Sequence, residues 1–298
     1  GAKRPFSIAM AGSDGRSLHD LNAAPLPKDW PVDALVVPKR VTFQSPDGLT
    51  IHGQLFQRDG GGRKPGVIFV HGGPPRQMLL GWHYMDYYSN GYAVNQYLAA
   101  HGFTVLSVNY RLGIGYGHDF EFPAHSSFAG GDEYKDVLSG ARYLQKLPGV
   151  DPNRIGIWGG SYGGYLTAMG LAHNSDVFKA GVDFHGVHDW SAFLAEWVGQ
   201  APKRYEQGDR DAALKVAFES SPVAAMGTWT SPVLLIQGDD DRNVNFHQTI
   251  DLARRLDARH VPYEEMVIPD EIHGFLRHIS WDRADKATVS FLTKELQH

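Results

Sequence analysis

The 298-residue sequence predicts an α/β fold in which a mostly parallel central sheet is covered by helices on both faces. Short, continuously apolar stretches alternate with stretches of helical period, and continuous apolar runs are typical of parallel strands buried on both faces. Two long excursions, residues 74–92 and 190–229, follow predicted strands, where α/β proteins place their sites. The predicted strands are 64–73, 103–110, 154–159, 180–186, 231–241 and 263–269. The predicted helices are 92–101, 133–147, one from 162, 246–260 and one from about 281.

The N-terminal forty residues differ from the rest. Residues 5–21, "PFSIAMAGSDGRSLHDL", predict a short hairpin that turns at Asp14-Gly15, because both turn positions tolerate positive φ. Four prolines within residues 22–40 then predict a semi-rigid linker. From Val41 the pattern is regular and begins with a second hairpin turning at Asp47-Gly48, which should add antiparallel strands to one edge of the sheet. Residues 41–298 are therefore expected to form the main domain.

Composition excludes several classes of function. The formal net charge is -5 and the basic residues are scattered, so no nucleic-acid partner is expected. No apolar run approaches the roughly 18–20 residues that span a bilayer, so no membrane partner is expected either. The chain has no cysteine, which excludes disulfides and thiolate chemistry. A soluble, cytoplasmic or periplasmic location fits these properties.

The stretch "RIGIWGGSYGGYLTAMGLA", residues 154–172, carries the most informative motif. Gly159 to Gly163 match G-x-S-x-G around Ser161, with an apolar strand before the motif and a helical run after it. This strand–turn–helix context is the nucleophile elbow of the α/β-hydrolase fold, which holds a serine in a strained turn. A tight glycine-rich turn with an incidental serine is the simpler alternative. The context favours Ser161 as a catalytic nucleophile.

A serine hydroxyl needs a base, and in this fold the acid and the histidine follow the serine in that order. Three aspartates, 239–241, follow a predicted strand, and one of them should orient the base. His273 follows the last predicted strand in "IPDEIHGF", and His278 is a weaker competitor. We predict His273 as the base.

The same aspartates have the alternating spacing of a calcium loop at Asp239, Asp241 and Asn243. That loop also needs glycine at its sixth position and glutamate at its twelfth. This sequence has Val244 and Ile250 there, so no metal site is predicted.

The segment "VIFVHGGP", residues 67–74, follows the first buried strand. The backbone N–H groups of Gly73 and Tyr162 could face a substrate oxygen from opposite sides, which makes an oxyanion hole. His71 lies at the end of the strand and is expected to support this loop by hydrogen bonding rather than to act as a base.

Five motifs together resemble the catalytic domain of the prolyl oligopeptidase family of serine peptidases: HGGP (71–74), NYRLGIGYG (109–117), GGSYGGY (159–165), GDDDRNV (238–244) and HGF (273–275). The dipeptidyl-peptidase IV and acylaminoacyl-peptidase branches are the most similar. The resemblance covers Val41 to the C-terminus. It implies that Asp241 is the acid of the triad and that Asn243 contacts a substrate carbonyl. It implies no cofactor, and it implies an apolar pocket for the residue before the cleaved bond, formed by Tyr162, Val187, Trp190, Phe193, Trp197 and Val244.

The sequence departs from the family pattern in two places. The family's catalytic domain sits beneath a β-propeller, which this chain lacks, so residues 1–40 are expected to be the last hairpin of that intramolecular partner and its linker. Gln237 replaces a histidine common in the family, which is expected to matter little to catalysis. The resemblance also allows a homodimer.

We therefore expect a serine exo- or oligopeptidase that cleaves short peptides through an acyl-enzyme intermediate. A carboxylesterase is the main alternative, since the same groups hydrolyse esters and the fold does not separate the two activities. A non-catalytic assembly module is the third possibility, and an intact triad argues against it.

Overall fold

The structure, a computed structural model, describes residues 1–21, 25–198 and 207–298, and the side chains of residues 197, 198, 207 and 208 also lie outside the description. Eight strands form the main sheet in the order β10-β9-β8-β7-β5-β6-β4-β3. They are β3 (Lys39–Gln44), β4 (Thr50–Phe56), β5 (Lys64–Val70), β6 (Thr104–Asn109), β7 (Val150–Gly160), β8 (Phe178–Phe184), β9 (Val233–Gly238) and β10 (Tyr263–Ile268). The pairs among β10, β9, β8, β7, β5 and β6 are parallel, and β4 pairs antiparallel with β3 and β6. The predicted parallel sheet with an antiparallel edge hairpin is confirmed.

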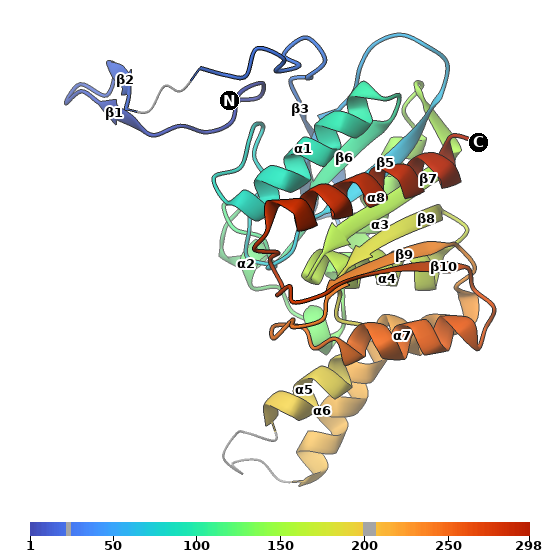
Figure 1. The fold of residues 1–298 in the computed structure, drawn as a ribbon. Coiled ribbons are helices and arrows are strands. Elements are labelled where there is room, and N and C mark those ends of the chain that lie inside the picture. The colour runs from blue at the N-terminus through green and yellow to red at the C-terminus, as the bar shows by residue number, and fades with distance from the viewer. Residues whose placement is uncertain (22–24, 199–206) are drawn as a thin grey trace.

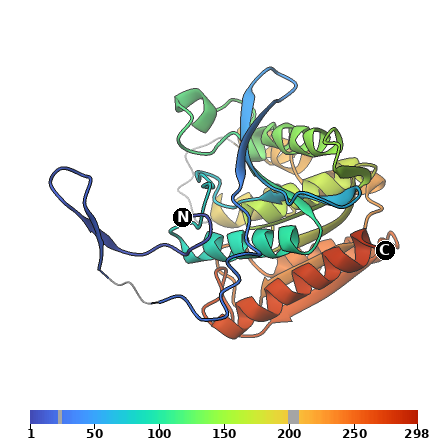
Figure 2. The same ribbon diagram turned by 90° about the horizontal axis from the view of Figure 1, so that it is seen from above.

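Helices cover both faces of this sheet, with α1 and α8 on one face and α3 and α4 on the other (Figures 1 and 2). The α-helices are α1 (Asp86–Ala100), α2 (His118–Glu121), α3 (Glu133–Gln145), α4 (Tyr162–Asn174), α5 (Trp190–Val198), α6 (Gln207–Glu219), α7 (His247–Asp257) and α8 (His278–Leu296). Two short 3₁₀ helices are η1 (Ser127–Ala129) and η2 (Pro222–Thr228).

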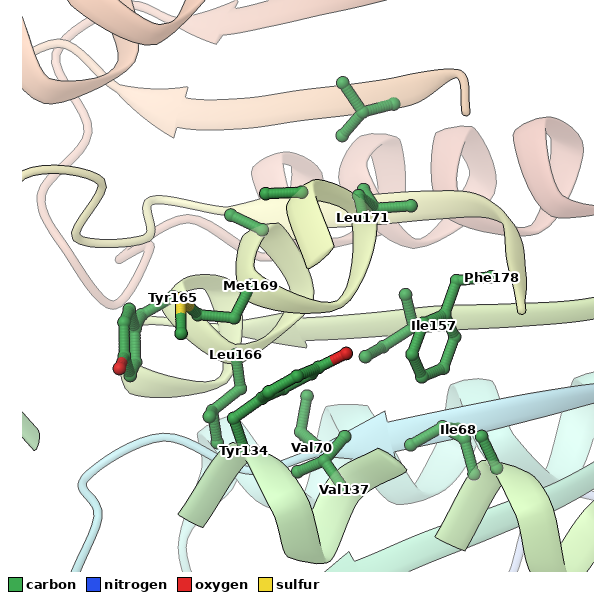
Figure 3. Close-up of a cluster of buried hydrophobic side chains, with 14 of the residues drawn as sticks. Ile68, Val70, Tyr134, Val137, Ile157, Tyr165, Leu166, Met169, Leu171 and Phe178 are labelled. Carbon is green, nitrogen blue, oxygen red and sulfur yellow. The ribbon is translucent and has the colours of Figure 1, made fainter. Parts of the chain in front are cut away.

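Successive side chains of each central strand enter two different cores. On β5, Ile68 and Val70 join the core under α3 and α4, whereas Val67 and Phe69 join the core under α1 and α8. Side chains alternate across a strand, so a strand buried on both faces must be apolar at every position. Figure 3 shows the first core, where Ile68 and Val70 lie among side chains of α3 and α4, including Val137 and Leu166.

The helix predicted at 92–101 begins earlier, at Asp86. Asn90 and Gly91 are weak helix formers and concealed this first part. Gly91 packs so closely on the sheet that a Cβ there would lie 3.0 Å from Phe69 Cζ. Tertiary packing therefore overrides local propensity. The last helix also begins earlier than predicted, at His278, and β7 begins at Val150.

The strand register brings several loops together at one edge of the sheet. Val70 on β5 lies opposite Gly159 on β7, and Phe184 on β8 lies opposite Gly160. Parallel strands end at the same edge, so the segments after β5, β7, β8, β9 and β10 leave the sheet together. The predicted site residues lie on these segments or directly after them.

The N-terminal hairpin consists of β1 (Ala9–Ala11) and β2 (Leu18–Asp20), which form a separate two-stranded sheet. In both ribbon views it stands away from the main sheet (Figures 1 and 2). All six strand residues are exposed. Within the described ranges, no helix combines the length and the apolar character that crossing a membrane would require.

Candidate active site

Ser161 occupies a strained turn between β7 and α4. Its backbone angles are φ 60° and ψ −120°, a region that costs a non-glycine residue free energy and that occurs at functional sites. The turn is tight because α4 begins directly against β5: a Cβ at Gly163 would lie 2.1 Å from the carbonyl oxygen of Val70. Only glycine fits there, so Gly163, two residues after the serine, is what allows the elbow to form.

His273 and Asp241 are joined by a hydrogen bond of 2.7 Å between Nδ1 of the imidazole and Oδ2 of the carboxylate. The other two aspartates of the cluster have different partners. Asp239 accepts the backbone N–H of Asp270, and Asp240 pairs with Arg242; both lie at the surface. Among the three aspartates that the sequence left open, Asp241 is the one in contact with the predicted base.

Asp241 is held as a carboxylate by several donors. Its Oδ1 accepts the backbone N–H groups of Asn243 and Val244. Burial alone would raise the pKa of Asp241, but the hydrogen bond and charge of His273, together with these backbone donors, lower the pKa below 3.8. An ionised Asp241 accepts the Nδ1 proton of His273, which leaves the Nε2 lone pair of His273 available as a base.

The loop that carries His273 is fastened by the carboxylate of Glu271. Oε1 accepts the hydroxyl of Ser280 at 2.6 Å, and Oε2 accepts the backbone N–H of Leu276 at 2.7 Å. Arg277 adds an ion pair at 2.9 Å. Glu271, which precedes His273 in the loop, is thus bonded to residues that follow His273, up to the first turn of α8. His278, the weaker competitor, is the exposed first residue of that helix.

The loop after β5 lies against the elbow. A Cβ on Gly72 would come 3.1 Å from Ser161 Cβ, so the neighbouring Gly73 is close to the serine as well. His71 is fully buried, its Nδ1 lies 2.9 Å from the carbonyl oxygen of Gly72, and its ring stacks on Tyr110. Burial lowers the pKa of His71 to about 4. His71 is therefore a neutral residue that supports the loop, as expected.

Five of the six residues expected to form an apolar pocket belong to the large core under α3 and α4 or pack against it. Tyr162, Val187, Trp190 and Val244 are buried in the same core, and Phe193 packs against it. The ring of Trp190 lies 5.9 Å from that of Tyr162 and 5.4 Å from that of Phe193. Trp197 belongs to α5, but its side chain lies outside the described residues. Asn243 is exposed beside Val244.

Three buried polar residues contact the site without having been predicted. Gln237 donates to Oδ2 of Asp241 at 3.1 Å and accepts from Thr249. Glu133 accepts the hydroxyl of Tyr162 at 2.6 Å, and burial raises the pKa of Glu133. His185 contacts the elbow directly. Gln237 was noted only as a departure from the family pattern, and no motif marks Glu133 or His185. Only the register of β8 beside β7 could have drawn attention to His185.

Ligand atoms of His185, Asp241 and His273 lie within 4.8 Å of one another, a spacing that could hold a metal ion. Both oxygens of Asp241 already accept hydrogen bonds from protein groups, and His273 uses Nδ1 for one of them. His185 has its own partners at both ring nitrogens. The hydrogen bonds of these three side chains are therefore made largely with one another and with neighbouring protein groups. Their ligand atoms are not arranged around a vacant metal position.

A mostly parallel sheet with a strained serine between a strand and a helix defines an α/β-hydrolase. The chain belongs to the prolyl oligopeptidase family, Peptidase_S9, whose family model matches residues 90–298. Dipeptidyl aminopeptidase BIII of Pseudoxanthomonas mexicana is 32% identical over 77% of the chain. Human dipeptidyl peptidase 8 is 29% identical over 92% of the chain. The predicted family and fold class are confirmed.

Solved structures are similar over almost the whole chain. A puromycin-hydrolysing peptidase of Mycobacterium tuberculosis matches 99% of the chain with a TM-score of 0.82 and 26% identity. The acylaminoacyl peptidase of Pyrococcus horikoshii matches 99% with a TM-score of 0.78 and 25% identity. The chain spans 45% and 47% of those two proteins. It spans 33% and 30% of the bacterial and human relatives named above.

Proposed function

We propose that this chain is the catalytic part of a serine peptidase that cleaves short peptides through an acyl-enzyme intermediate. Ser161 is the nucleophile, His273 the general base and acid, and Asp241 the group that orients His273. The hydrogen bond between His273 and Asp241 is the observation that carries this proposal. His185 contacts both the backbone N–H of the strained Ser161 and the ring of His273. Membership of the peptidase family supports it.

The reaction follows from the tautomer of His273. Because Nδ1–H faces Asp241, the free lone pair is on Nε2, which takes the hydroxyl proton as Ser161 Oγ bonds to the substrate carbonyl carbon. His273 then gives that proton to the leaving amine, and the C–N bond breaks. Water, deprotonated in the same way, attacks the acyl-enzyme and releases Ser161. The charge of Asp241 stabilises the imidazolium that forms twice in this cycle.

The backbone N–H groups of Gly73 and Tyr162 are the proposed oxyanion donors. Tyr162 is the first residue of α4, and the first N–H groups of a helix have no partner within the helix. Gly73 is exposed on the loop that approaches Ser161 from β5. Two such donors, each contributing about 3–4 kcal/mol, would stabilise the tetrahedral intermediate.

Substrate specificity is proposed to come from an apolar pocket and one polar contact. An aromatic and aliphatic wall would suit proline, alanine or another small apolar residue before the cleaved bond. Asn243 would hold a substrate carbonyl. The proposed pocket residues are Tyr162, Val187, Trp190, Phe193, Trp197 and Val244.

Labelling with a fluorophosphonate tests the nucleophile. The wild-type chain should react at Ser161, and Ser161→Ala should not. Labelling of the variant would remove Ser161 from the mechanism. Absence of labelling in a folded wild-type chain would remove the serine-hydrolase proposal altogether.

A substrate panel separates a peptidase from a carboxylesterase. The panel contains X-Pro-anilides, acyl-alanyl-anilides and short nitrophenyl esters, and the enzyme is this chain, alone and joined to the N-terminal β-propeller proposed below. Hydrolysis of at least one anilide is expected. Hydrolysis of esters alone would favour the carboxylesterase.

We further propose that residues 1–40 are the last hairpin and linker of an N-terminal β-propeller and that 41–298 are the catalytic domain. The hairpin supports this because its large apolar side chains face solvent in the chain, as a surface made for another domain would. The exposed residues are Phe6, Ile8, Met10, Leu18 and Leu21. A homodimer is proposed as well, and sedimentation of the propeller-containing protein would test it.

A further inference from the structure

His185 lies directly after β8, where the chain leaves the sheet beside the elbow. Its φ is 40°, a left-handed value that is costly for a residue with a Cβ. The side chain is 1% exposed, and the backbone N–H donates to the carbonyl oxygen of Ile236 at 2.8 Å. Core packing alone would not need an imidazole at a strained backbone position.

One edge of the His185 ring faces the nucleophile. The backbone N–H of Ser161 points to the carbonyl oxygen of Phe184 at 2.8 Å and to Nδ1 of His185 at 3.2 Å. Because Nδ1 receives an N–H, it carries a lone pair, and the ring proton of a neutral imidazole is then on Nε2. Nε2 lies 3.3 Å from the hydroxyl oxygen of Tyr87. This pair of contacts fixes the tautomer of His185.

The same ring also packs against the base. The ring centroids of His185 and His273 are 4.1 Å apart, with an angle of 48° between their planes. The hydrogen bond to Asp241 fixes one atom of His273 and leaves the ring free to turn about that bond. A second ring packed against it at this distance restricts that rotation. Asp241 and His185 therefore hold His273 along two different directions.

The charge of His185 matters because His273 becomes an imidazolium during the reaction. Burial, followed by the charge of His273, pushes the pKa of His185 well below 6.5, while Asp241 opposes this shift. A neutral ring places no positive charge beside this imidazolium. A protonated His185 would repel it.

We propose that His185 is a positioning residue for acyl transfer, which sets the plane of the His273 ring through ring packing and the position of the Ser161 amide through Nδ1. This inference rests on the proposed serine-hydrolase function. It gives His185 no direct contact with the reacting atoms, so its effect must pass through His273 and the elbow.

Tyr87 completes the arrangement from α1. A Cβ on Gly160 would lie 1.8 Å from the Tyr87 hydroxyl oxygen, so the glycine before Ser161 makes space for the group that holds Nε2 of His185. The ring of Tyr87 is in turn held edge-on by Trp281 of α8, with centroids 5.1 Å apart.

The test is a set of variants assayed on a short nitrophenyl ester and by the rate of fluorophosphonate labelling. His185→Asn is the main variant, because asparagine tolerates a left-handed φ and has a carbonyl oxygen that can replace Nδ1, but lacks the ring face. We expect kcat to fall about 10- to 100-fold, as for an ångström-scale misplacement of a catalytic group, with KM unchanged. An unchanged kcat would overturn the proposal.

A second background separates positioning from a general structural defect. If His185 acts through His273, then His185→Asn should cause no further loss in a His273→Ala chain, because residues that act as a unit are strongly non-additive. Ser161→Ala sets the floor of the assay. An equal loss in both backgrounds would show a structural role and overturn the proposal.

His188→Asn is the matched control. His188 is equally buried, three residues further on, and its ring bonds to Asp183 and to the carbonyl oxygen of Gln248 rather than to the triad. Any loss that it causes should be the same in the presence and absence of the His273 side chain.

Tyr87→Phe keeps the test decisive if His185→Asn does not fold. It removes only the hydroxyl that holds Nε2 of His185, and a smaller drop in kcat that disappears in the His273→Ala background is expected. If the wild-type chain is active and labels with the fluorophosphonate, and Tyr87→Phe leaves kcat unchanged, the inference is overturned. A folded wild-type chain that fails to label would instead overturn the proposed function, and the inference with it.

Discussion

Gln237 donates a hydrogen bond through Nε2 to Oδ2 of Asp241, the same oxygen that accepts the imidazole N–H of His273. The same amide nitrogen also donates to the carbonyl oxygen of Val244, and Oε1 accepts the hydroxyl of Thr249. Gln237 therefore orients Asp241, the proposed acid. The expectation that its departure from the family pattern matters little is a prediction that kinetics can test.

Gln237→Glu should reduce kcat/KM about tenfold, equivalent to about 1.4 kcal/mol of transition-state stabilisation. A second carboxylate at this distance would share a proton with Asp241, which weakens the charge available to the His273 imidazolium. Steady-state kinetics measures the change. Gln248→Glu is the control, because Gln248 is also buried but bonds to His188 and Asp189. Equal losses in the two variants would contradict the assignment.

Asp241→Asn should lower kcat roughly 10⁴-fold, because an amide can leave His273 in the wrong tautomer while the geometry is preserved. Single-turnover kinetics on an activated ester would measure it. Asp239→Asn should remain close to wild type, since Asp239 bonds to the backbone of Asp270. Near-wild-type activity of Asp241→Asn would move the role to another acid.

Glu271 should make the His273 loop sensitive to acid. Burial by itself would raise the pKa of Glu271, but the Ser280 hydroxyl, Arg277 and two backbone N–H groups lower it from 4.5 to about 2. A depressed folded-state pKa contributes stability that is fully present above pH 4.5 and is lost as the pH falls from 4.5 through 2.

Glu271→Gln should therefore be destabilised by roughly 2–3 kcal/mol at pH 7, with a difference from wild type that shrinks below pH 4.5. Urea unfolding at several pH values measures it. Glu264→Gln, on the exposed side of β10 opposite Lys294, should show little of this dependence. A constant difference across the pH range would count against the carboxylate clamp.

Asp285 on α8 is predicted to destabilise the chain at neutral pH. Burial first, and then the charge of Asp282, raise the pKa of Asp285 from 3.8 to about 7. The carboxyl lines a small cavity of about 10 Å³ together with Tyr87 and Trp281. Its folded-state pKa lies above the unfolded value, so stability falls as the pH rises from 3.8 to 7 and is then constant.

Asp285→Asn should raise Tm by roughly 2–6 °C at pH 8. The gain should almost disappear at pH 4, where the native carboxyl is protonated and the unfolded one is close to its midpoint, so the acidic measurement is the internal control. Thermal melting followed by circular dichroism gives both values. A gain at pH 4 as large as that at pH 8 would argue against the ionisation account.

Much of the fold was predictable because local pattern and tertiary structure agree. The apolar runs of β5 and β7 specify strands buried on both faces, and the glycines around Ser161 mark the elbow. The beginning of α1 was not predictable, because Gly91 is favoured by close packing on Phe69 rather than by helix propensity.

The site divides in the same way. Ser161 and His273 were predicted from motif and chain order. The residues alone left three aspartates open, and only the family resemblance selected Asp241. Gln237, which bonds to Asp241 four residues further on, stood out only as a departure from the family pattern. His185 carries no motif, since its partners are distant in sequence and adjacent only in the fold. Residues of this kind become visible when strand order and register are known.

The parts of the site enter the chain in a fixed temporal order during synthesis. The elbow follows β7, the proposed acid follows β9, and the proposed base follows β10, on a loop that Glu271 fastens to Ser280 of α8. A growing chain that has already made Ser161 therefore has no anchored His273 until α8 emerges. Such an order would keep a nascent hydrolase from acting on its surroundings, or on itself, before α8 is in place.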